Sequence, residues 1–415
     1  MPALFWTRAD RIAIIALIFL TLRKEVCPHM WKNRNFLLIC LLNIVSWLSL
    51  YMLNTTIVPY AKTLGAATSV AGIVSGLYFV ASFGTRPFSG VLGDRFSRKK
   101  LFLFSSVLLA VAGLGLIFVK HIWLLLVLRA LQGVGYSITT TIAMALAADT
   151  LPADQIGAGI GYFGLTTVIG QMAGPAMALA IQERWGYPVM LAVSLLLRLA
   201  ALALTFTLPE NAARPRLRAS GRPRLSLWSI VERRSLLPAG VGMLFSTLNS
   251  AISAFLVVHA EAYQIPGAGM FFTVSTLTMF LARSLCSRLT DRRSLASTAL
   301  FSGCLCIATM LLLGLGRSQT TLLLAGAVFG VGYGTLLPVT QARSVQLAPP
   351  ERRSLGSSTY YIGIDIGFSL SNLVCGRLVD CVGSGPMYLL LILPALGAMS
   401  LALWKGRGAP PQSQE

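Results

Sequence analysis

Charged residues are scarce in this chain, and histidines are rarer still. Of the 415 residues, 12% are Asp, Glu, Lys or Arg, and the three histidines are far apart in the sequence. A membrane enzyme generally needs a cluster of histidines, acids or metal ligands at one depth. An ATP-driven pump needs a Gly-x-x-x-x-Gly-Lys-Ser/Thr loop to bind phosphates, and the sequence has none. The composition therefore argues against an enzyme and against an ATP-driven pump, and it predicts no cofactor.

The seven cysteines lack the spacing of a metal site. The one close pair is Cys304-x-Cys306, which lies inside an apolar run. Cysteines in such surroundings behave as small hydrophobic residues. No metal and no disulfide framework is expected.

Long apolar runs are what the chain has in abundance. Hydrophobic residues make up 55% of it, and its mean hydropathy is +0.73. A bilayer core of about 30 Å requires about 20 apolar residues per helix, and lipid tolerates repeated runs of this length only as helices. The sequence therefore predicts an all-α, polytopic membrane protein with twelve transmembrane helices, at 36–59, 69–91, 101–119, 122–148, 156–181, 187–208, 236–259, 268–289, 296–315, 320–343, 355–380 and 386–404.

The net charge of +20 is distributed unevenly among the predicted loops. Basic clusters can bind nucleic acid, but alternation of basic loops is how a membrane protein is oriented, with the basic loops inside. One set of loops holds many arginines and lysines, from Arg95, Arg98, Lys99 and Lys100 to Lys405 and Arg407, whereas the other set holds only Lys62, Lys120, Arg184 and Arg317. The predicted partner is the lipid bilayer of the plasma membrane and not nucleic acid, and both termini are predicted to be cytoplasmic.

The chain repeats itself at a shift of 197 residues. Arg86 aligns with Arg283, Asp94 with Asp291, and the stretch 133–136 (Gly-Val-Gly-Tyr) with 330–333. Such a register indicates an internal duplication. The predicted organisation is a surface segment 1–35, a six-helix bundle 36–208, a basic cytoplasmic linker 209–235, a second six-helix bundle 236–404 and a disordered tail 405–415.

The loop from Gly90 to Lys100 carries the most specific pattern. It reads Gly-x-x-x-Asp-Arg-x-x-Arg-Lys-Lys, with Asp94, Arg95 and Arg98 as its first charged residues. Charge counting alone would need only a basic loop, whereas Asp94 and Arg95 recur in the second copy. Between the second and third helices of a duplicated twelve-helix protein, this pattern resembles the signature loop of the major facilitator superfamily.

That resemblance implies a conformational latch. In the family the acid of the loop faces the start of the eleventh helix, where a carboxylate contributes about 0.3–1 kcal/mol, and an arginine of the loop pairs with an acid ending the fourth helix. Here these positions are Asp94 and Arg98, and Asp149 is the acid ending the fourth helix. The expectation is a latch of Gly90, Asp94, Arg95, Arg98 and Asp149 that joins the two halves and holds the cytoplasmic side closed.

Arg129 lies about seven residues inside the fourth predicted span, in Arg-x-x-Gln132-Gly-x-Gly. An arginine within a span costs about 2.5–3.5 kcal/mol on insertion scales, so it usually faces a cavity or a partner. The alternative is that its side chain snorkels to the outer surface. The pattern resembles the superfamily motif associated with proton coupling, which implies that role for Arg129 and Gln132.

Gly170, Gly174 and Pro175 form a third pattern, in the fifth span. Glycines four residues apart allow helices to approach closely, and Pro175 removes a backbone donor, so plain helix packing is one interpretation. The other comes from resemblance, because Gly-x-x-x-Gly-Pro at this place is similar to the motif of superfamily exporters, especially drug–proton antiporters.

Asp365 is the one acid near the centre of a predicted span. Burial disfavours the charged form of a carboxylate, so Asp365 could bind and release a proton. The alternative is a structural ion pair, for which Arg129 or Arg198 is the expected partner. Arg86 and Arg283 are repeat mates, interpreted as structural residues near cytoplasmic helix ends.

Polar stripes on three spans predict the substrate cavity. Small polar and aromatic residues share faces at helical spacing, although such residues also pack helices. They include few charges, which suits a modest-sized, partly apolar organic solute. The candidates are Asn43, Trp47, Tyr51 and Asn54 on the first span, Asn249 on the seventh and Tyr361 on the eleventh.

Together these features predict a monomeric secondary transporter that works by alternating access. The expected activity is proton-coupled efflux of a small organic molecule or drug. Two alternatives stay open: a proton-coupled importer of a similar solute, and a non-transporting sensor on the same fold.

Overall fold

The computed structural model describes residues 33–151, 156–208, 231–290, 294–349 and 353–406. The predicted segment 1–35 and tail 405–415 lie largely outside these ranges. Within them the chain is almost entirely helical, and no strand occurs. The helices of the first half are α2 Arg34–Thr63, α3 Thr68–Arg95, α4 Arg98–Ile117, α5 Ile122–Asp149 and α6 Ile156–Phe206. Those of the second half are α8 Leu236–Ala262, α9 Ala268–Thr290, α10 Leu295–Leu315, α11 Gln319–Gln346, α12 Arg353–Val382, α13 Ser384–Leu390 and α14 Ile392–Gly406.

Ten helical stretches in the described ranges are long and apolar enough to cross a membrane. This confirms the prediction of an all-α, polytopic membrane protein, whereas the count of twelve spans stays a prediction. The predicted spans 156–181 and 187–208 both fall on α6, which has 51 residues. A straight helix of that length would measure about 77 Å, far more than a bilayer core. Gly186 interrupts it with a non-helical backbone (φ 79°, ψ 177°).

The last predicted span, 386–404, coincides with one stretch that is long and apolar enough to cross a membrane, Ser384–Trp404. This stretch is divided into α13 and α14. The break falls at Leu391, just before Pro394, which has no backbone N–H to donate to the preceding turn. The predicted linker 209–235 lies outside the described residues up to 230, but its end is docked. The backbone N–H of Glu232 donates to Thr359 Oγ1 at 2.9 Å, and Ser235 Oγ donates to the Ser344 carbonyl oxygen at 2.6 Å.

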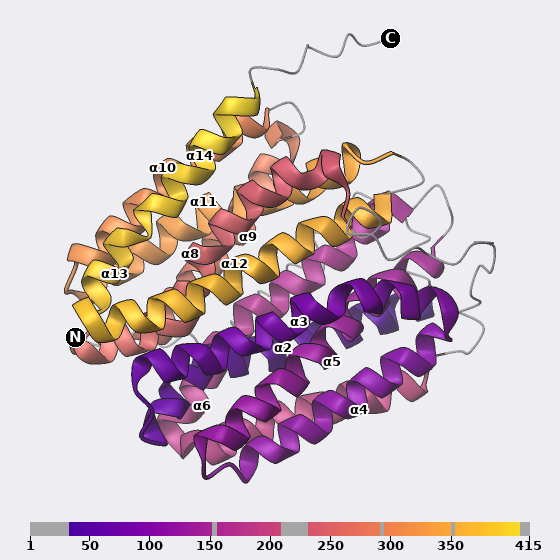
Figure 1. Cartoon of the computed structure of the whole chain (residues 1–415), viewed down its shortest axis with the longest axis horizontal. Coiled ribbons are helices and arrows are strands. Elements are labelled where there is room, and N and C mark those ends of the chain that lie inside the picture. Colours follow the sequence, from indigo (N-terminus) through magenta and orange to yellow (C-terminus); the bar gives the residue numbers. More distant parts are fainter. Residues whose placement is uncertain (1–32, 152–155, 209–230, 291–293, 350–352, 407–415) are drawn as a thin grey trace.

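The helices form two groups that lie side by side (Figure 1). Helices α2–α6 pack against one another, as do α8–α14, and the groups meet where α3 packs on α12, α2 on α8 and α6 on α9. We call the end with the connections after α3, α5, α9 and α11 the basic end, and the other the opposite end. Helices α3 and α12 run antiparallel, and their contact is the most extensive one between the two groups.

Equivalent glycines make equivalent contacts in the two groups. Gly133 on α5 lies directly against the Tyr78 carbonyl oxygen of α3, and Gly330 on α11 lies against the Ser275 carbonyl oxygen of α9. Both residues of one contact are 197 positions from those of the other. A side chain at either glycine would overlap with backbone atoms, which explains why both copies keep glycine there.

Candidate functional site

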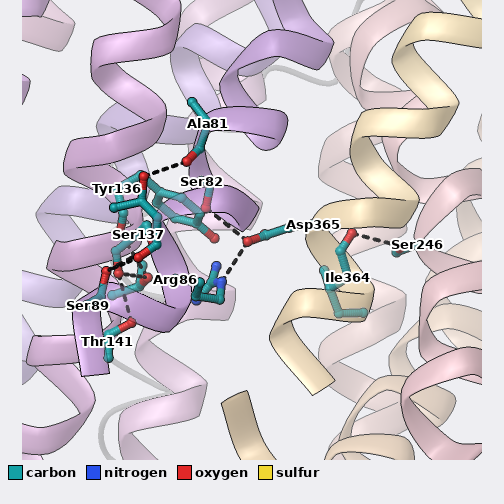
Figure 2. A network of polar contacts seen from close by, with 12 residues as sticks. Ala81, Ser82, Arg86, Ser89, Tyr136, Ser137, Thr141, Ser246, Ile364 and Asp365 are labelled. Carbon is teal, nitrogen blue, oxygen red and sulfur yellow. Dashed lines mark hydrogen bonds and ion pairs between the residues drawn. The ribbon is translucent and has the colours of Figure 1, made fainter. Parts of the chain in front are cut away.

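An ion pair joins α3 to α12 (Figure 2). Arg86 Nε donates to Asp365 Oδ2 at 2.6 Å, and Ser82 Oγ donates to the same oxygen at 2.9 Å. The side chains of Arg86 and Asp365 are 3% and 1% exposed. Because each half contributes one partner, this ion pair connects the two halves.

The structure corrects two expectations about these charges. The partner of Asp365 is Arg86, and not Arg129 or Arg198. Arg86, which was expected near a helix end, lies well inside α3 (Thr68–Arg95) and pairs with a residue of the other half. Periodicity places residues on helix faces, but it carries no information about how far α3 is displaced along α12. The pairing therefore depends on tertiary register.

Aromatic side chains surround the ion pair. The Arg86 guanidinium carbon lies 5.7 Å from the Tyr136 ring centre and 5.3 Å from that of Tyr361. Arg86 Nη2 is buried without a hydrogen-bond partner. Gln341 Nε2 donates to the Tyr361 hydroxyl at 3.0 Å. Rings placed over a guanidinium attract it electrostatically, more strongly where water is excluded.

From the ion pair to the opposite end, α3 and α12 form a closed seam. The rings of Phe79 and Phe368 meet edge to face at 4.7 Å. One turn further, Asn372 Nδ2 donates to Ser75 Oγ at 3.0 Å.

The outermost part of the seam is formed by backbone contact. A Cβ atom at Gly72 would overlap the Asn372 carbonyl oxygen and lie 3.1 Å from Gly376 Cα. At the very end, the Asp380 carboxylate accepts the N–H groups of Thr68 (3.1 Å) and Ser69 (2.6 Å). It thus caps α3, which has no side-chain cap of its own. Helices α3 and α12 are thus in direct contact from the ion pair to the opposite end of the molecule.

Arg129 is inside the first half. Its side chain is fully buried, which excludes the snorkelling alternative. Its Nη1 donates to Gln132 Oε1 at 3.0 Å and its Nη2 to Asn54 Oδ1 at 2.9 Å. The guanidinium carbon lies 4.3 Å from the Tyr78 ring centre. The predicted pair Arg129 and Gln132 is therefore in contact, but separate from Asp365.

The predicted exporter pattern packs α6 on α2. A Cβ atom at Gly174 would lie 2.8 Å from Tyr51 Cβ and 3.0 Å from the Leu48 carbonyl oxygen. A Cβ atom at Gly170 would lie closer still to α2, at 2.7 Å from Leu48 N. Pro175 is inside α6. The described contacts are those of close helix packing.

The predicted cavity residues divide into two sets. Trp47 stacks on Tyr51 (5.8 Å) and meets Tyr136 edge to face (5.7 Å). The Tyr136 and Tyr361 rings both lie beside the Arg86 guanidinium, and we call the rings of Trp47, Tyr51, Tyr136 and Tyr361 the aromatic surface beside the ion pair.

The amide residues make internal contacts instead. Asn43 Nδ2 donates to Thr166 Oγ1 at 2.7 Å, and its Oδ1 accepts from Trp47 Nε1 at 3.0 Å. Asn54 holds Arg129. Asn249 is buried, and its Nδ2 has no hydrogen-bond partner.

Part of the predicted latch is outside the described residues. Gly90, Asp94 and Arg95 belong to the end of α3, but their side chains are not among those described. Arg98 Nη1 forms an ion pair with Asp149 Oδ2 and donates to the Ala145 carbonyl oxygen at 3.3 Å. This pair joins α4 to α5 within one half, so by itself it does not connect the two halves as expected.

Comparison with known proteins agrees with this architecture. The family model described as Major Facilitator Superfamily matches residues 39–372 and 241–415. The chain belongs to the major facilitator superfamily. Its fold and family are those of membrane transporters, not of enzymes.

Relatives in the superfamily are distant but extend over most of the chain. The uncharacterized MFS-type transporter YhhS of Escherichia coli (strain K12) is 22% identical, with 92% of this chain and 94% of YhhS covered. A multi-drug resistance efflux pump PmrA homolog of Lactococcus lactis subsp. lactis (strain IL1403) is 25% identical, with 77% and 82% covered. A solved POT family transporter superposes with a TM-score of 0.77 at 14% identity, with 90% and 96% covered.

Sequence reasoning passed over Ser82 and Tyr136, and it interpreted Arg86 as a structural residue. The sequence did offer one signal for this site, namely that Arg86 is a cation in an apolar span. Charged residues inside a membrane usually have a function. The recurrence of Arg86 as Arg283 favoured a structural interpretation.

Proposed function

We propose that this protein exports a small organic molecule by proton-coupled alternating access, with Arg86 and Asp365 as the coupling centre. The supporting observation is that the buried acid and its cation come from different halves. A coupling ion that acts on this pair acts directly on the contact between the moving parts.

The coupling follows from the cost of separating buried charges. Parting α3 from α12 leaves a buried carboxylate and a buried guanidinium without each other, which costs about 3–5 kcal/mol. A proton on Asp365 removes one charge and with it most of the attraction. Proton binding therefore favours opening of the opposite end, and proton release restores the closed seam.

The aromatic surface beside the pair is the proposed substrate contact. Trp47, Tyr51, Tyr136 and Tyr361 present large rings next to one charged pair, as in sites for partly apolar organic molecules. A solute bound there would disturb the pairing of Arg86 with Asp365, so solute and proton would act on the same contact between the halves.

Efflux is the proposed direction, with the basic end in the cytoplasm of a cell bounded by the plasma membrane. Support comes from the Gly170-x-x-x-Gly174-Pro175 pattern and from the distant likeness to an efflux pump homolog. Import of a similar solute is the competing direction. The two directions differ in inside-out vesicles: an exporter accumulates solute in them, whereas an importer removes solute from them.

The direct experiment is proton flux in liposomes that contain the purified protein and a pH-sensitive dye. With a pH gradient imposed, at least one solute from a broad panel of small organic molecules should accelerate its collapse several-fold over empty liposomes. If no solute changes the proton flux, the transport proposal is wrong and a sensor on the same fold takes its place.

At the basic end, we propose that Arg98 and Asp149 support the latch. The pair fixes α4 on α5 and so positions the loop of Gly90, Asp94 and Arg95 against the second half. The side chains of Arg98 and Asp149 are 19% and 32% exposed. Exposed ion pairs contribute only about 0.2–1 kcal/mol to stability.

Asp149→Asn should therefore lower the transport rate several-fold while it changes stability by less than about 1 kcal/mol. Glu183→Gln, which alters an exposed acid of α6, is the control and should leave transport unchanged. Equal rates for both variants and the wild type would remove the latch role.

A further inference from the structure

The interior of the first half carries more positive charge than the described acids balance. Arg86, Arg129 and Arg198 are 4%, 0% and 7% exposed. In the described helices, Asp365 is the acid that lies away from a helix end, and Arg86 occupies it. Arginine stays protonated in proteins, so two buried cations remain to be neutralised.

Arg129 has only neutral partners among the described residues. Two of its nitrogens donate to amide oxygens, of Gln132 and Asn54, and its Nε is buried without a hydrogen-bond partner. Buried charges are normally paired. An amide oxygen orients a guanidinium but supplies no opposite charge.

Arg198, on the second part of α6, also lacks a described partner, although its nitrogens are not among the fully buried atoms without one. The part of the chain that the structure describes offers its guanidinium no ion-pair partner, and no hydrogen bond forms there. Arg198 lines a small cavity together with Gln132, Ser194 and several leucines. Since Gln132 also binds Arg129, the two cations face one region between α5 and α6.

Tyr78 adds a third unused donor. Its ring lies under Arg129 at 4.3 Å, and both Arg129 and Arg198 are near enough for their charges to act on it. The hydroxyl is buried without a hydrogen-bond partner. Arg198 therefore lines the small apolar-walled cavity itself, whereas Arg129 and Tyr78 lie beside it, next to Gln132.

We propose that this region binds a small monovalent anion. The carboxylate group of an organic substrate and an inorganic halide share the chemistry that it requires: one negative charge and acceptor atoms for several N–H and O–H donors. The planar fork of arginine matches a carboxylate in particular. Anion binding does not depend on the proposed transport activity. Only the suggestion that the anion is the carboxylate of a transported substrate rests on the proposed function.

The test is thermal unfolding of the purified full-length protein in detergent, titrated separately with sodium chloride and sodium acetate. A ligand present at many times its dissociation constant should raise the apparent Tm in a saturable way, by about 3–5 °C. The shift should disappear in Arg198→Gln. It should persist in Arg317→Gln, which removes an exposed arginine of the second half that stacks on Tyr263 at 3.7 Å.

Tyr78→Phe covers the case that Arg198→Gln does not fold. It keeps the ring and removes one donor, so the apparent anion affinity should fall about three- to tenfold. A shift with acetate assigns the site to a carboxylate, and a shift with chloride alone assigns it to a halide. No saturable shift in the wild type, or equal shifts in the wild type, Arg198→Gln and Tyr78→Phe, overturns the proposal. Proton flux in liposomes is a separate readout, so a failed transport assay leaves this result interpretable.

Discussion

Replacing Arg86 with glutamine is expected to abolish proton-coupled transport and to lower the free energy of unfolding by about 3–5 kcal/mol. The variant leaves Asp365 buried without its cation. Ser82 would be its remaining hydrogen-bond donor among the described residues. An isolated buried carboxylate binds a proton instead of staying charged, so it can no longer exchange protons with the transport cycle. Solute-driven proton flux in liposomes and denaturant unfolding measure the two effects.

The double variant Arg86→Gln with Asp365→Asn separates coupling from stability. Removing both charges avoids the unpaired carboxylate, so much of the lost stability should return, whereas coupled transport should stay absent. If the double variant were as unstable as Arg86→Gln alone, the pair would not behave as one electrostatic unit. If either variant kept wild-type proton coupling, the pair could not be the coupling centre.

Gly72→Ala should have the second large effect, because it opens the α3–α12 seam. The added Cβ would overlap the Asn372 carbonyl oxygen and press on Gly376 Cα, and both are backbone atoms that cannot turn aside. Overpacking of this kind typically costs about 1–3 kcal/mol. Because this cost destabilises only the state in which the opposite end is closed, it lowers the ratio of closed to open molecules roughly 5- to 150-fold. The turnover rate should fall accordingly.

The matched control is Gly84→Ala on the same helix. A Cβ there has no heavy atom within 4 Å, so the substitution adds helix propensity and nothing else. Transport should stay within twofold of the wild type. Equal loss of transport in both variants would show that α3 tolerates no alanine for reasons unrelated to the seam.

The sequence was sufficient to predict the parts of this fold that depend on one helix at a time. Apolar runs place the helices, because lipid leaves the backbone no other way to satisfy its hydrogen bonds. The duplication at a shift of 197 even predicts matching contacts, as Gly133 and Gly330 show. Asp365 stood out for the same local reason, since it is a lone acid in an apolar run.

The relation between helices was beyond the sequence. Asp365 could be singled out, but its partner depends on how α12 is displaced along α3, which no periodicity encodes. Arg129 and Arg198 were plausible partners because they lie deep within predicted spans. Arg86 is the actual partner because α3 packs directly on α12. Pro394 was a local signal for the break at Leu391. The long apolar run around it nevertheless led to the prediction of one continuous span.

The central claim is that the halves alternate about Arg86 and Asp365, and distances between spin labels test it most directly. One pair of labels, at Ala67 and Cys381, reports on the opposite end, and a second, at Lys100 and Gln346, on the basic end, in a cysteine-free background. Lower pH should lengthen the distance at the opposite end and shorten it at the basic end, and Gly72→Ala should shift both in the same directions. Distances that stay fixed from high to low pH, or that lengthen at both ends together, would contradict the account.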